Sequence, residues 1–387
     1  MIVHDKKMLD NLALIKEANS LLKAGFISKE QNDIIKKELP VFKSQNNILV
    51  RLGFFVLGSL LYLSICGTVS LLGIDNADFF WEICFYIFAI IGFAGSEFFA
   101  REKYYKYGLD DAFMLGTILN ISIAIGISTD GYELVIATFV ALISFIIYKR
   151  YLYSLGMLIF CCSFLAVLFY GLFEFGNIGK TILPFVIMLV SAVFYFFTKK
   201  IGQKNSKVYY YKGILIANSF CLISFYLSGN YFVVRELSGM FLGNEILPGQ
   251  DVPFAFLFYG FTFIIPIVYL VWALRTHDRI MLWISFLAIA FSIFSIRFYY
   301  SVLPTEVALT LGGFVLFMIA YFSIQKLKNK ESGLTFKPDR INTSNAILNA
   351  EALIVASTFG AKPEVKTDSP MDFGGGGFSG GGSGGSF

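Results

Sequence analysis

The stretch Tyr151–Phe173 reads YLYSLGMLIFCCSFLAVLFYGLF and holds 23 residues without one charged side chain. An α-helix rises about 1.5 Å per residue, so this stretch would be roughly 34 Å long, enough to cross a hydrocarbon core of about 30 Å. Backbone N–H and C=O groups must be paired inside the segment when lipid surrounds it. The stretch therefore predicts a transmembrane helix.

Nine further apolar stretches of 17 to 22 residues share this character. They are Leu52–Gly73, Phe79–Ala100, Asp111–Ser128, Tyr132–Tyr148, Lys180–Thr198, Lys212–Phe232, Pro253–Ala273, Ile280–Tyr300 and Pro304–Ile324. Hydrophobic residues make up 56% of the chain and charged residues 15%, against about 25% charged in a soluble domain. We therefore expect an all-α fold, a polytopic transmembrane helix bundle with about ten spans.

The number of Lys and Arg residues is high in every second connection and low in the others. One set of connections, together with both terminal segments, carries 28 of the 31 Lys and Arg residues, and the other set holds Lys180, Arg235 and Arg297. Cytoplasmic loops are rich in Lys and Arg, so this bias predicts that the N- and C-termini are both cytoplasmic. Residues 1–47 would then form a cytoplasmic helical segment, 48–324 the bundle, 325–371 a cytoplasmic basic segment, and 372–387 a Gly-rich tail.

Residues 5–40 favour a small helical hairpin. Gly25 can end the first helix in a left-handed conformation, and the sequence from Ser28 to Gln31 is typical of a capping box that starts a second helix. Pro40 would end that second helix. We expect the apolar face of this hairpin to pack on a partner, on another copy, or on the bundle, and we expect no nucleic-acid binding.

The segment ANSLLKAGFISKEQ at residues 18–31, followed by many spans, resembles the N-terminal part of an uncharacterised family of bacterial multi-pass membrane proteins, known only as a domain of unknown function. That family has a Gly-Leu-Ile-Ser-like turn between two short helices, and residues 25–28 stand in its place here. The resemblance covers about forty residues and the general layout. It implies a protein of the bacterial inner membrane, but no established activity or catalytic residues.

The segment after residue 324 is polar and then of low complexity. Residues 325–343 carry five cations that suit anionic lipid headgroups, so membrane lipids are expected partners. Nine of the last fourteen residues are Gly, which predicts a flexible coil. A passive tail is one interpretation; the spacing of Phe373, Phe378 and Phe387 favours the alternative that the tail docks on a partner.

Charged residues in the spans lie near the span ends, where helix dipoles account for most of them. Asp110 and Asp111 open the third span, and Glu97 precedes Arg101 by four residues, an order that favours an ion pair within one helix. Arg297 and Glu306 flank one short outer turn. We expect these two side chains to form an outer charge pair in a partly dry site.

Two amides are expected deep in the bundle, at Asn120 and Asn218. Interhelical hydrogen bonding and the polar lining of a substrate path explain them equally well. Small residues at Gly92 and Gly95 mark a predicted helix-packing face. The connection 233–252 is rich in Gly and is expected to be a turn-rich outer loop, large enough for a lid or a partner site.

Enzyme motifs with the right context are absent from the sequence, so no enzymatic activity and no cofactor are expected. Gly-x-Ser-x-Gly occurs at 377–381 and 381–385, where no strand and helix flank the serine as a nucleophile elbow requires. The five cysteines lie inside predicted spans without a CxxC spacing, and the chain has two histidines, so no metal site is expected.

These features favour a non-enzymatic scaffold or regulator of an envelope process, with the N-terminal hairpin and the Gly-rich tail as contact elements for another membrane or cytoplasmic protein. The alternative is a secondary transporter or lipid flippase built from two inverted five-span repeats. No self-similarity between residues 52–173 and 180–324 supports that alternative.

Overall fold

The structure is a computed structural model, and it describes residues 2–23, 25–45, 47–71, 77–204, 208–242, 251–276, 278–300 and 305–327. The described chain divides into two compact units. The first comprises the described parts of 2–10 and 41–327, and the second is residues 11–40. The basic segment beyond 327 and the Gly-rich tail, with Phe373, Phe378 and Phe387, lie outside the described residues.

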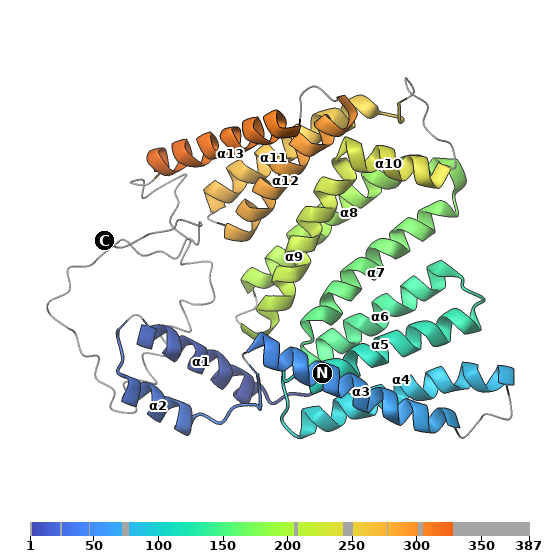
Figure 1. Cartoon of the computed structure of the whole chain (residues 1–387), viewed down its shortest axis with the longest axis vertical. Coiled ribbons are helices and arrows are strands. Elements are labelled where there is room, and N and C mark those ends of the chain that lie inside the picture. Colours follow the sequence, from blue (N-terminus) through green and yellow to red (C-terminus); the bar gives the residue numbers. More distant parts are fainter. Residues whose placement is uncertain are drawn as a thin grey trace. The chain divides into compact units, whose positions relative to one another are not determined.

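The described residues form thirteen α-helices (Figure 1). They are α1 (Lys6–Lys23), α2 (Lys29–Glu38), α3 (Ile48–Leu71), α4 (Ala77–Arg101), α5 (Leu109–Ser128), α6 (Glu133–Tyr151), α7 (Ser154–Phe173), α8 (Gly176–Lys204), α9 (Val208–Gly229), α10 (Tyr231–Leu242), α11 (Ala255–Thr276), α12 (Arg279–Tyr300) and α13 (Thr305–Leu327). Within the described residues, a helix covers most of each of the ten predicted apolar stretches, which confirms the all-α class.

Eight of these helices are long and apolar enough to cross a membrane: α3 to α9 and α11. The apolar parts of α12 and α13, Arg279–Ser295 and Thr310–Phe322, are shorter than these eight. A multi-pass membrane protein follows from the eight helices. Many large apolar side chains of α3 are exposed, such as Leu57, Leu60 and Leu63, as expected of a helix that faces lipid.

Helices that follow each other in the chain pack as antiparallel neighbours in Figure 1, with α4 on α5, α6 on α7, α8 on α9 and α11 on α12. Helix α3 packs mainly on α5. Helix α7 packs on α6 and also contacts α8 and α9. Helix α9 also contacts α11 and α12. This up-and-down order places the N-termini of α3, α5, α7 and α9 at one end of the bundle.

The α4–α5 contact confirms the packing face predicted from small residues. A Cβ atom on Gly92 would lie 2.6 Å from Oγ1 of Thr117, and one on Gly95 would lie 2.2 Å from the ring of Phe113. Neither distance leaves room for a methyl group, so glycine is needed for this close approach. The backbones come near enough for extensive van der Waals contact, which drives helix association when lipid replaces water.

The ends of several helices differ from the predicted boundaries. Helix α6 runs to Tyr151, three residues beyond the predicted end, and α7 begins at Ser154 after Leu152 in a left-handed conformation with φ 57°. Lys149 and Arg150 therefore belong to the last helical turn rather than to a loop. Cations are favoured there because the helix dipole is negative at its C-terminus.

The connection between α4 and α5 is held by the segment that leads into α3. The Lys43 N–H donates to the Lys103 carbonyl at 2.9 Å, and the Tyr105 N–H donates back to the Lys43 carbonyl at 3.1 Å. The Val3 N–H donates to the Arg150 carbonyl at 3.0 Å. Backbone groups at this end of the bundle are thus satisfied by extended segments from the N-terminal part of the chain.

The second unit holds most of the helical hairpin predicted for residues 5–40, namely the later part of α1 and all of α2. Gly25 has φ 76°, and the Ser28 capping box is formed, with the Gln31 N–H donating to Oγ of Ser28 at 3.2 Å and the Ser28 N–H donating to the Gln31 side chain at 2.7 Å. Ala18, Ile27 and Ile35 form its small core. Both the left-handed glycine and the capping box confirm the sequence prediction.

The turn-rich loop predicted for 233–252 is wrong for residues 233–242, which are helical. These residues belong to helix α10, and residues 243–250 lie outside the described residues. Tyr231 and Val234 of α10 bury their side chains with Val252, which precedes α11, and with Phe258 of α11, and this burial stabilises the helix. A Cβ atom on Gly239 would have no neighbour within 4 Å, so no close contact requires glycine at this position. The role of this region as a lid or partner site stays a prediction.

Candidate functional site

The predicted outer charge pair lies at the α12–α13 connection. Arg297 is in the last turn of α12 and Glu306 in the first turn of α13. Residues 301–304 between them lie outside the described residues. Their coupling stays a prediction.

Asn120 lies on α5 and binds across to α3. Its amide donates to the Tyr62 hydroxyl at 2.9 Å and to the Gly116 carbonyl at 2.8 Å, and the Tyr62 hydroxyl donates to the Phe88 carbonyl of α4 at 2.7 Å. Tyr62 is only 4% exposed. Three helices are therefore tied by one chain of hydrogen bonds around Asn120.

Asn218 lies on α9 and accepts a hydrogen bond from the buried Thr198 hydroxyl of α8. A third amide, Asn230 at the end of α9, was missed by the sequence analysis. It is fully buried, donates to the Tyr226 hydroxyl at 3.0 Å, and accepts from the Ser295 hydroxyl of α12 at 3.3 Å. A substrate path along Asn120 and Asn218 stays a prediction.

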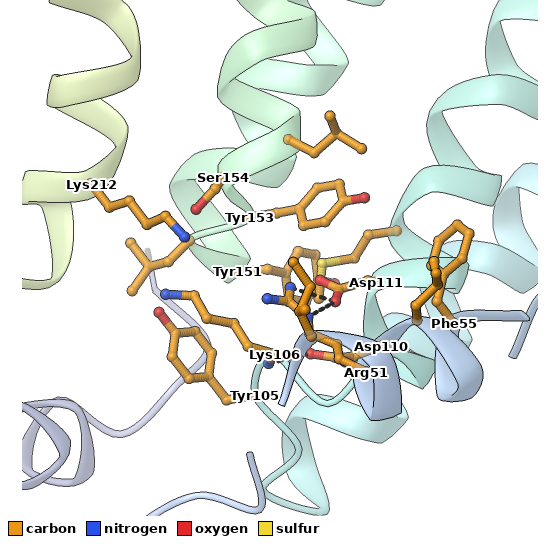
Figure 2. Close-up of a pocket in the computed structure, with 15 residues that line it drawn as sticks. Arg51, Phe55, Tyr105, Lys106, Asp110, Asp111, Tyr151, Tyr153, Ser154 and Lys212 are labelled. Atoms are coloured by element: carbon orange, nitrogen blue, oxygen red, sulfur yellow. Dashed lines mark hydrogen bonds and ion pairs between the residues drawn. The ribbon is translucent and has the colours of Figure 1, made fainter. Parts of the chain in front are cut away.

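A pocket of about 380 Å³ with both charged and apolar lining residues opens at the end of the bundle where α3, α5, α7 and α9 begin (Figure 2). Its polar and charged lining residues are Arg51, Tyr105, Lys106, Asp110, Asp111, Tyr151, Tyr153, Ser154 and Lys212. Its apolar lining residues are Ile48, Leu52, Phe55, Met114, Leu152 and Leu155. The volume falls in the range of small-molecule sites, roughly 300–1,000 Å³.

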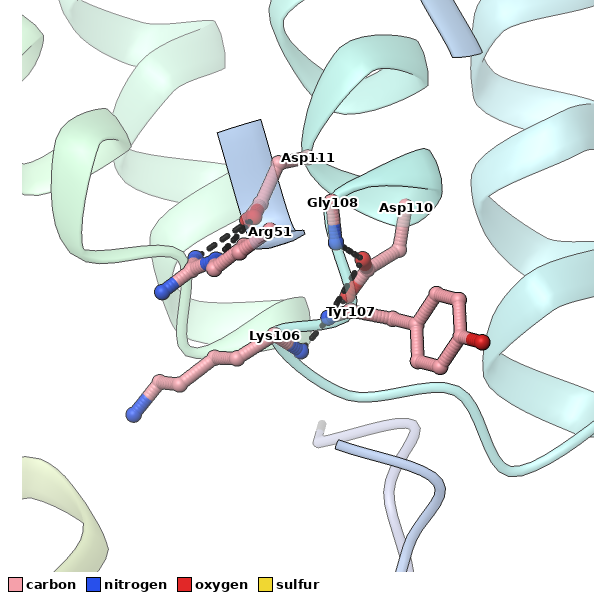
Figure 3. A network of polar contacts seen from close by, with 6 residues as sticks. All are labelled: Arg51, Lys106, Tyr107, Gly108, Asp110 and Asp111. Atoms are coloured by element: carbon pink, nitrogen blue, oxygen red, sulfur yellow. Dashed lines mark hydrogen bonds and ion pairs between the residues drawn. The ribbon is translucent and has the colours of Figure 1, made fainter. Parts of the chain in front are cut away.

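Asp110 organises the turn on one side of this pocket (Figure 3). Its carboxylate accepts three backbone N–H groups, from Lys106 at 2.8 Å, Tyr107 at 3.0 Å and Gly108 at 2.9 Å. Gly108 has φ 114°, and a Cβ atom there would lie 2.3 Å from the Arg51 carbonyl, so the position requires glycine. The turn that carries Lys106 is therefore fixed by a buried carboxylate.

Asp111 forms an ion pair with Arg51 of α3. The Arg51 Nε donates to Oδ2 of Asp111 at 2.7 Å, and a second guanidinium nitrogen lies within ion-pair distance of the same oxygen. The Asp111 side chain is 9% exposed and that of Arg51 31%. The pair joins the first turns of α3 and α5 (Figure 3), and both residues line the pocket.

Two lysines come to the pocket from different parts of the chain. Lys106 lies in the α4–α5 connection and Lys212 in the first turn of α9, and Figure 2 shows both side chains extending toward the same part of the pocket. The Lys106 amine lies 4.6 Å from the centre of the Tyr105 ring. Burial raises the pKa of the Tyr105 and Tyr153 phenols, so both hydroxyls stay protonated and able to donate at neutral pH.

Glu97 pairs across helices, not with Arg101 as the spacing within α4 predicted. Its carboxylate accepts from the Arg150 guanidinium and from the Tyr151 hydroxyl, both on α6. Tyr151 is 1% exposed. The helix-internal prediction was wrong because α6 continues to Tyr151 and brings two donors to Glu97, and an interhelical partner in a drier site outweighs an exposed i,i+4 pair.

His4 is buried beside the same end of the bundle, with 3% of its surface exposed. Its ring packs edge-on against Phe42, with centroids 5.3 Å apart, and against Tyr105 at 5.0 Å. Neither ring nitrogen makes a hydrogen bond of normal geometry to the described residues. Burial lowers the pKa of His4 to about 4, although the nearby Asp110 carboxylate and the Tyr151 backbone favour the protonated ring.

This pocket was not predicted from the sequence. The helix dipole alone accounted for Asp110 and Asp111, and Arg51, Lys106 and Lys212 counted only as separate cations of three segments of the chain. One signal was available: Arg51, Lys106 and Lys212 all lie in the cation-rich set of segments, and the segments of one set meet at the same end of an up-and-down bundle. Sequence spacing does not report which of those connections are adjacent.

Within the described residues, no group of three His, Cys, Asp or Glu side chains could hold a metal ion. Comparisons of the chain with protein-family models, with curated proteins and with solved structures found no match. The resemblance of residues 18–31 to the uncharacterised membrane-protein family stays a prediction.

We expect Arg51 and Asp111 to be energetically coupled. Arg51→Met leaves a buried carboxylate without its partner, which should lower stability by about 1–3 kcal/mol, because Arg51 is partly exposed and full burial would cost more. Asp111→Asn should cost a comparable amount, and Arg51→Met combined with Asp111→Asn should cost less than the sum. Thermal stability in detergent measures the three values; additive losses would show that the two side chains act independently.

The buried His4 predicts a pH-dependent stability. The unfolded chain binds a proton near pH 6.5 and the folded chain only near pH 4, so the free energy of unfolding should fall as pH drops between these values, by at most about 1.4 kcal/mol per pH unit. Above pH 6.5 His4 should contribute no pH dependence. The measurement is the thermal midpoint in detergent from pH 7.5 to 4.5.

His4→Gln should flatten that decline relative to the wild type. His277→Gln removes the second of the two histidines and serves as the matched control, which should follow the wild-type curve. Parallel curves for the wild type and His4→Gln would contradict the assignment of a low pKa to His4.

Proposed function

We propose that this protein crosses a bacterial inner membrane about ten times, with both termini in the cytoplasm. The eight long apolar helices support a multi-pass protein, and α12 and α13 would supply the remaining two spans. The orientation rests on the location of 28 of 31 cations on one set of connections. Arg51, Lys106, Arg150 and Lys212 belong to four of these segments, and all lie near the same end of the bundle.

We further propose a non-enzymatic scaffold or regulator. The observation that carries this proposal is the use of three amides, because Asn120, Asn218 and Asn230 all make hydrogen bonds that tie helices together. Side chains used in this way stabilise one arrangement of the bundle. A carrier needs polar groups that exchange partners with a substrate near the middle of the membrane.

The N-terminal hairpin is the proposed contact element for another membrane or cytoplasmic protein. It leaves Phe26, at 57% exposed, and Ile34, at 46%, on its surface while Ile35 fills its core. Apolar side chains kept in water at a small helical unit are typical anchors for a partner. The Gly-rich tail, through Phe373, Phe378 and Phe387, is the second proposed contact element.

A secondary transporter or lipid flippase of two inverted five-span repeats is the alternative. The charged pocket beside Arg51 favours it, because a site of that volume can hold a small solute or a headgroup. That pocket lies at helix ends rather than at mid-depth of the helices. The scaffold is therefore the first candidate.

Reporter fusions test the topology. Fusions after Gly202 and after Lys330 should report a cytoplasmic location, and a fusion after Glu245 an external one, since the charge alternation places these positions on opposite sides. Equal expression of the three fusions is checked with an epitope on the reporter. A cytoplasmic signal at Glu245 would overturn the ten-span count.

Co-purification tests the scaffold proposal. The full chain, solubilised in mild detergent after crosslinking in cells, should retain at least one defined protein partner, identified by mass spectrometry. Phe26→Ser combined with Ile34→Ser should lower its recovery, because both anchors become polar. The variant should keep the wild-type thermal midpoint, since neither residue is in the hairpin core.

The matched control is Lys29→Ser combined with Lys37→Ser, which changes two exposed polar positions of the same hairpin. Truncation after Asp372 tests the tail in the same way. Unchanged recovery of every partner in both the anchor variant and the truncation would sink the scaffold proposal.

A further inference from the structure

The pocket beside Arg51 combines an excess of positive charge with an exposed apolar side. Arg51, Lys106 and Lys212 bring three cations to it, and Asp110 and Asp111 bring two carboxylates. Asp111 is paired with Arg51, and both oxygens of Asp110 accept backbone N–H groups. The carboxylates are thus engaged with the protein, and the net charge of the lining favours an anionic ligand.

The start of α7 adds to this preference. Ser154 and Leu155, the first two residues of α7, line the pocket, and Tyr153 makes no side-chain cap at this helix N-terminus. The first N–H groups of a helix have no intrahelical acceptor and carry the positive end of the helix dipole. A phosphate group is well suited to such a place when cationic side chains surround it.

The apolar side of the pocket is continuous with the surface of α3. Ile48 is 79% exposed and Leu52 57%, and both line the pocket. The exposed apolar side chains of α3 continue along its length with Val56, Leu60 and Leu63. Leu155 of α7, at 40% exposed, lies on the same apolar side. A ligand seated here would contact cations at one end and lipid-facing helix surface at the other.

We propose that this pocket binds the headgroup of an anionic glycerophospholipid, with Lys106, Lys212 and the start of α7 at the phosphate and the acyl chains along α3. A soluble phosphate compound shares the headgroup chemistry but has no acyl chain to contact the apolar side of the site. Basic pockets between transmembrane helices are typical lipid headgroup sites. The proposal requires a chain embedded in a membrane, and it does not depend on the scaffold role.

The test uses the full chain, purified in a neutral detergent and delipidated. Phosphatidylglycerol is titrated against the thermal midpoint, and native mass spectrometry counts the lipids that stay bound. We expect phosphatidylglycerol to raise the midpoint in a saturable way and phosphatidylcholine to do so much less, because its headgroup carries no net charge. Glycerol 3-phosphate and inorganic phosphate should have little effect at the same concentrations.

Lys106→Gln combined with Lys212→Gln should weaken phosphatidylglycerol binding by about tenfold or more and remove one retained lipid, since two charge-assisted contacts are lost. Lys212 is exposed and Lys106 half-buried, so the midpoint without lipid should change little. Lys212→Gln alone gives a milder variant. The matched control, Lys149→Gln combined with Lys200→Gln, removes two exposed cations from the last parts of α6 and α8, outside the pocket lining, and should bind as the wild type does.

Three results would overturn the proposal. Equal stabilisation by phosphatidylcholine would mean that the effect is not recognition of an anionic headgroup. Equal effects of glycerol 3-phosphate would assign the pocket to a soluble phosphate compound. Equal losses in the pocket variant and its control would mean that general surface charge attracts the lipid. None of these results depends on recovery of a protein partner, so failure here is distinct from failure of the scaffold proposal.

Discussion

A peptide N–H or C=O left unpaired in hydrocarbon costs several kcal/mol, and this constraint governs every element of the bundle. Helices satisfy it within each segment. The hydroxyl groups obey the same constraint, since Thr117 donates to the Phe113 carbonyl at 2.9 Å and Ser96 to the Gly92 carbonyl at 2.9 Å. With these groups satisfied locally, helix association depends on close packing, and glycines on α4 let Thr117 and Phe113 of α5 approach its backbone.

Polar contacts between helices then select one arrangement among the many that packing alone allows. Tyr62 and Asn120 tie α3, α4 and α5 together, and Tyr226 donates to the Ala288 carbonyl at 2.9 Å and so ties α9 to α12. Near the helix ends the contacts become charged, with Arg51 on Asp111 and Arg150 on Glu97. These pairs hold the helix ends that surround the pocket, so the fold and the proposed lipid site depend on the same residues.

The treatment of charge shows where sequence reasoning succeeds and where it does not. The helix dipole accounted for the position of Asp110 and Asp111, and it is correct that both open α5. It did not provide their partners, which are the backbone of the 106–108 turn and Arg51, sixty residues before Asp111. Glu97 shows this more clearly. Its predicted partner Arg101 is four residues away in the sequence, but Glu97 pairs with Arg150, which is fifty-three residues away. Sequence spacing identifies possible partners within one helix. Burial decides which of two possible partners contributes more to stability.

The sequence by itself determined the helical class, the positions of the ten apolar helices to within a few residues, and the left-handed Gly25 and capping box of the hairpin. These follow from local chemistry, namely the length of apolar runs, the conformational freedom of glycine and the reach of a serine side chain. Tertiary structure alone decided that region 233–252 begins with a helix, that His4 is buried among aromatic rings, and that Arg51, Lys106 and Lys212 line one pocket. Each of these depends on which helices lie side by side. The apolar segments resemble one another in composition, so the sequence does not specify which of them are neighbours.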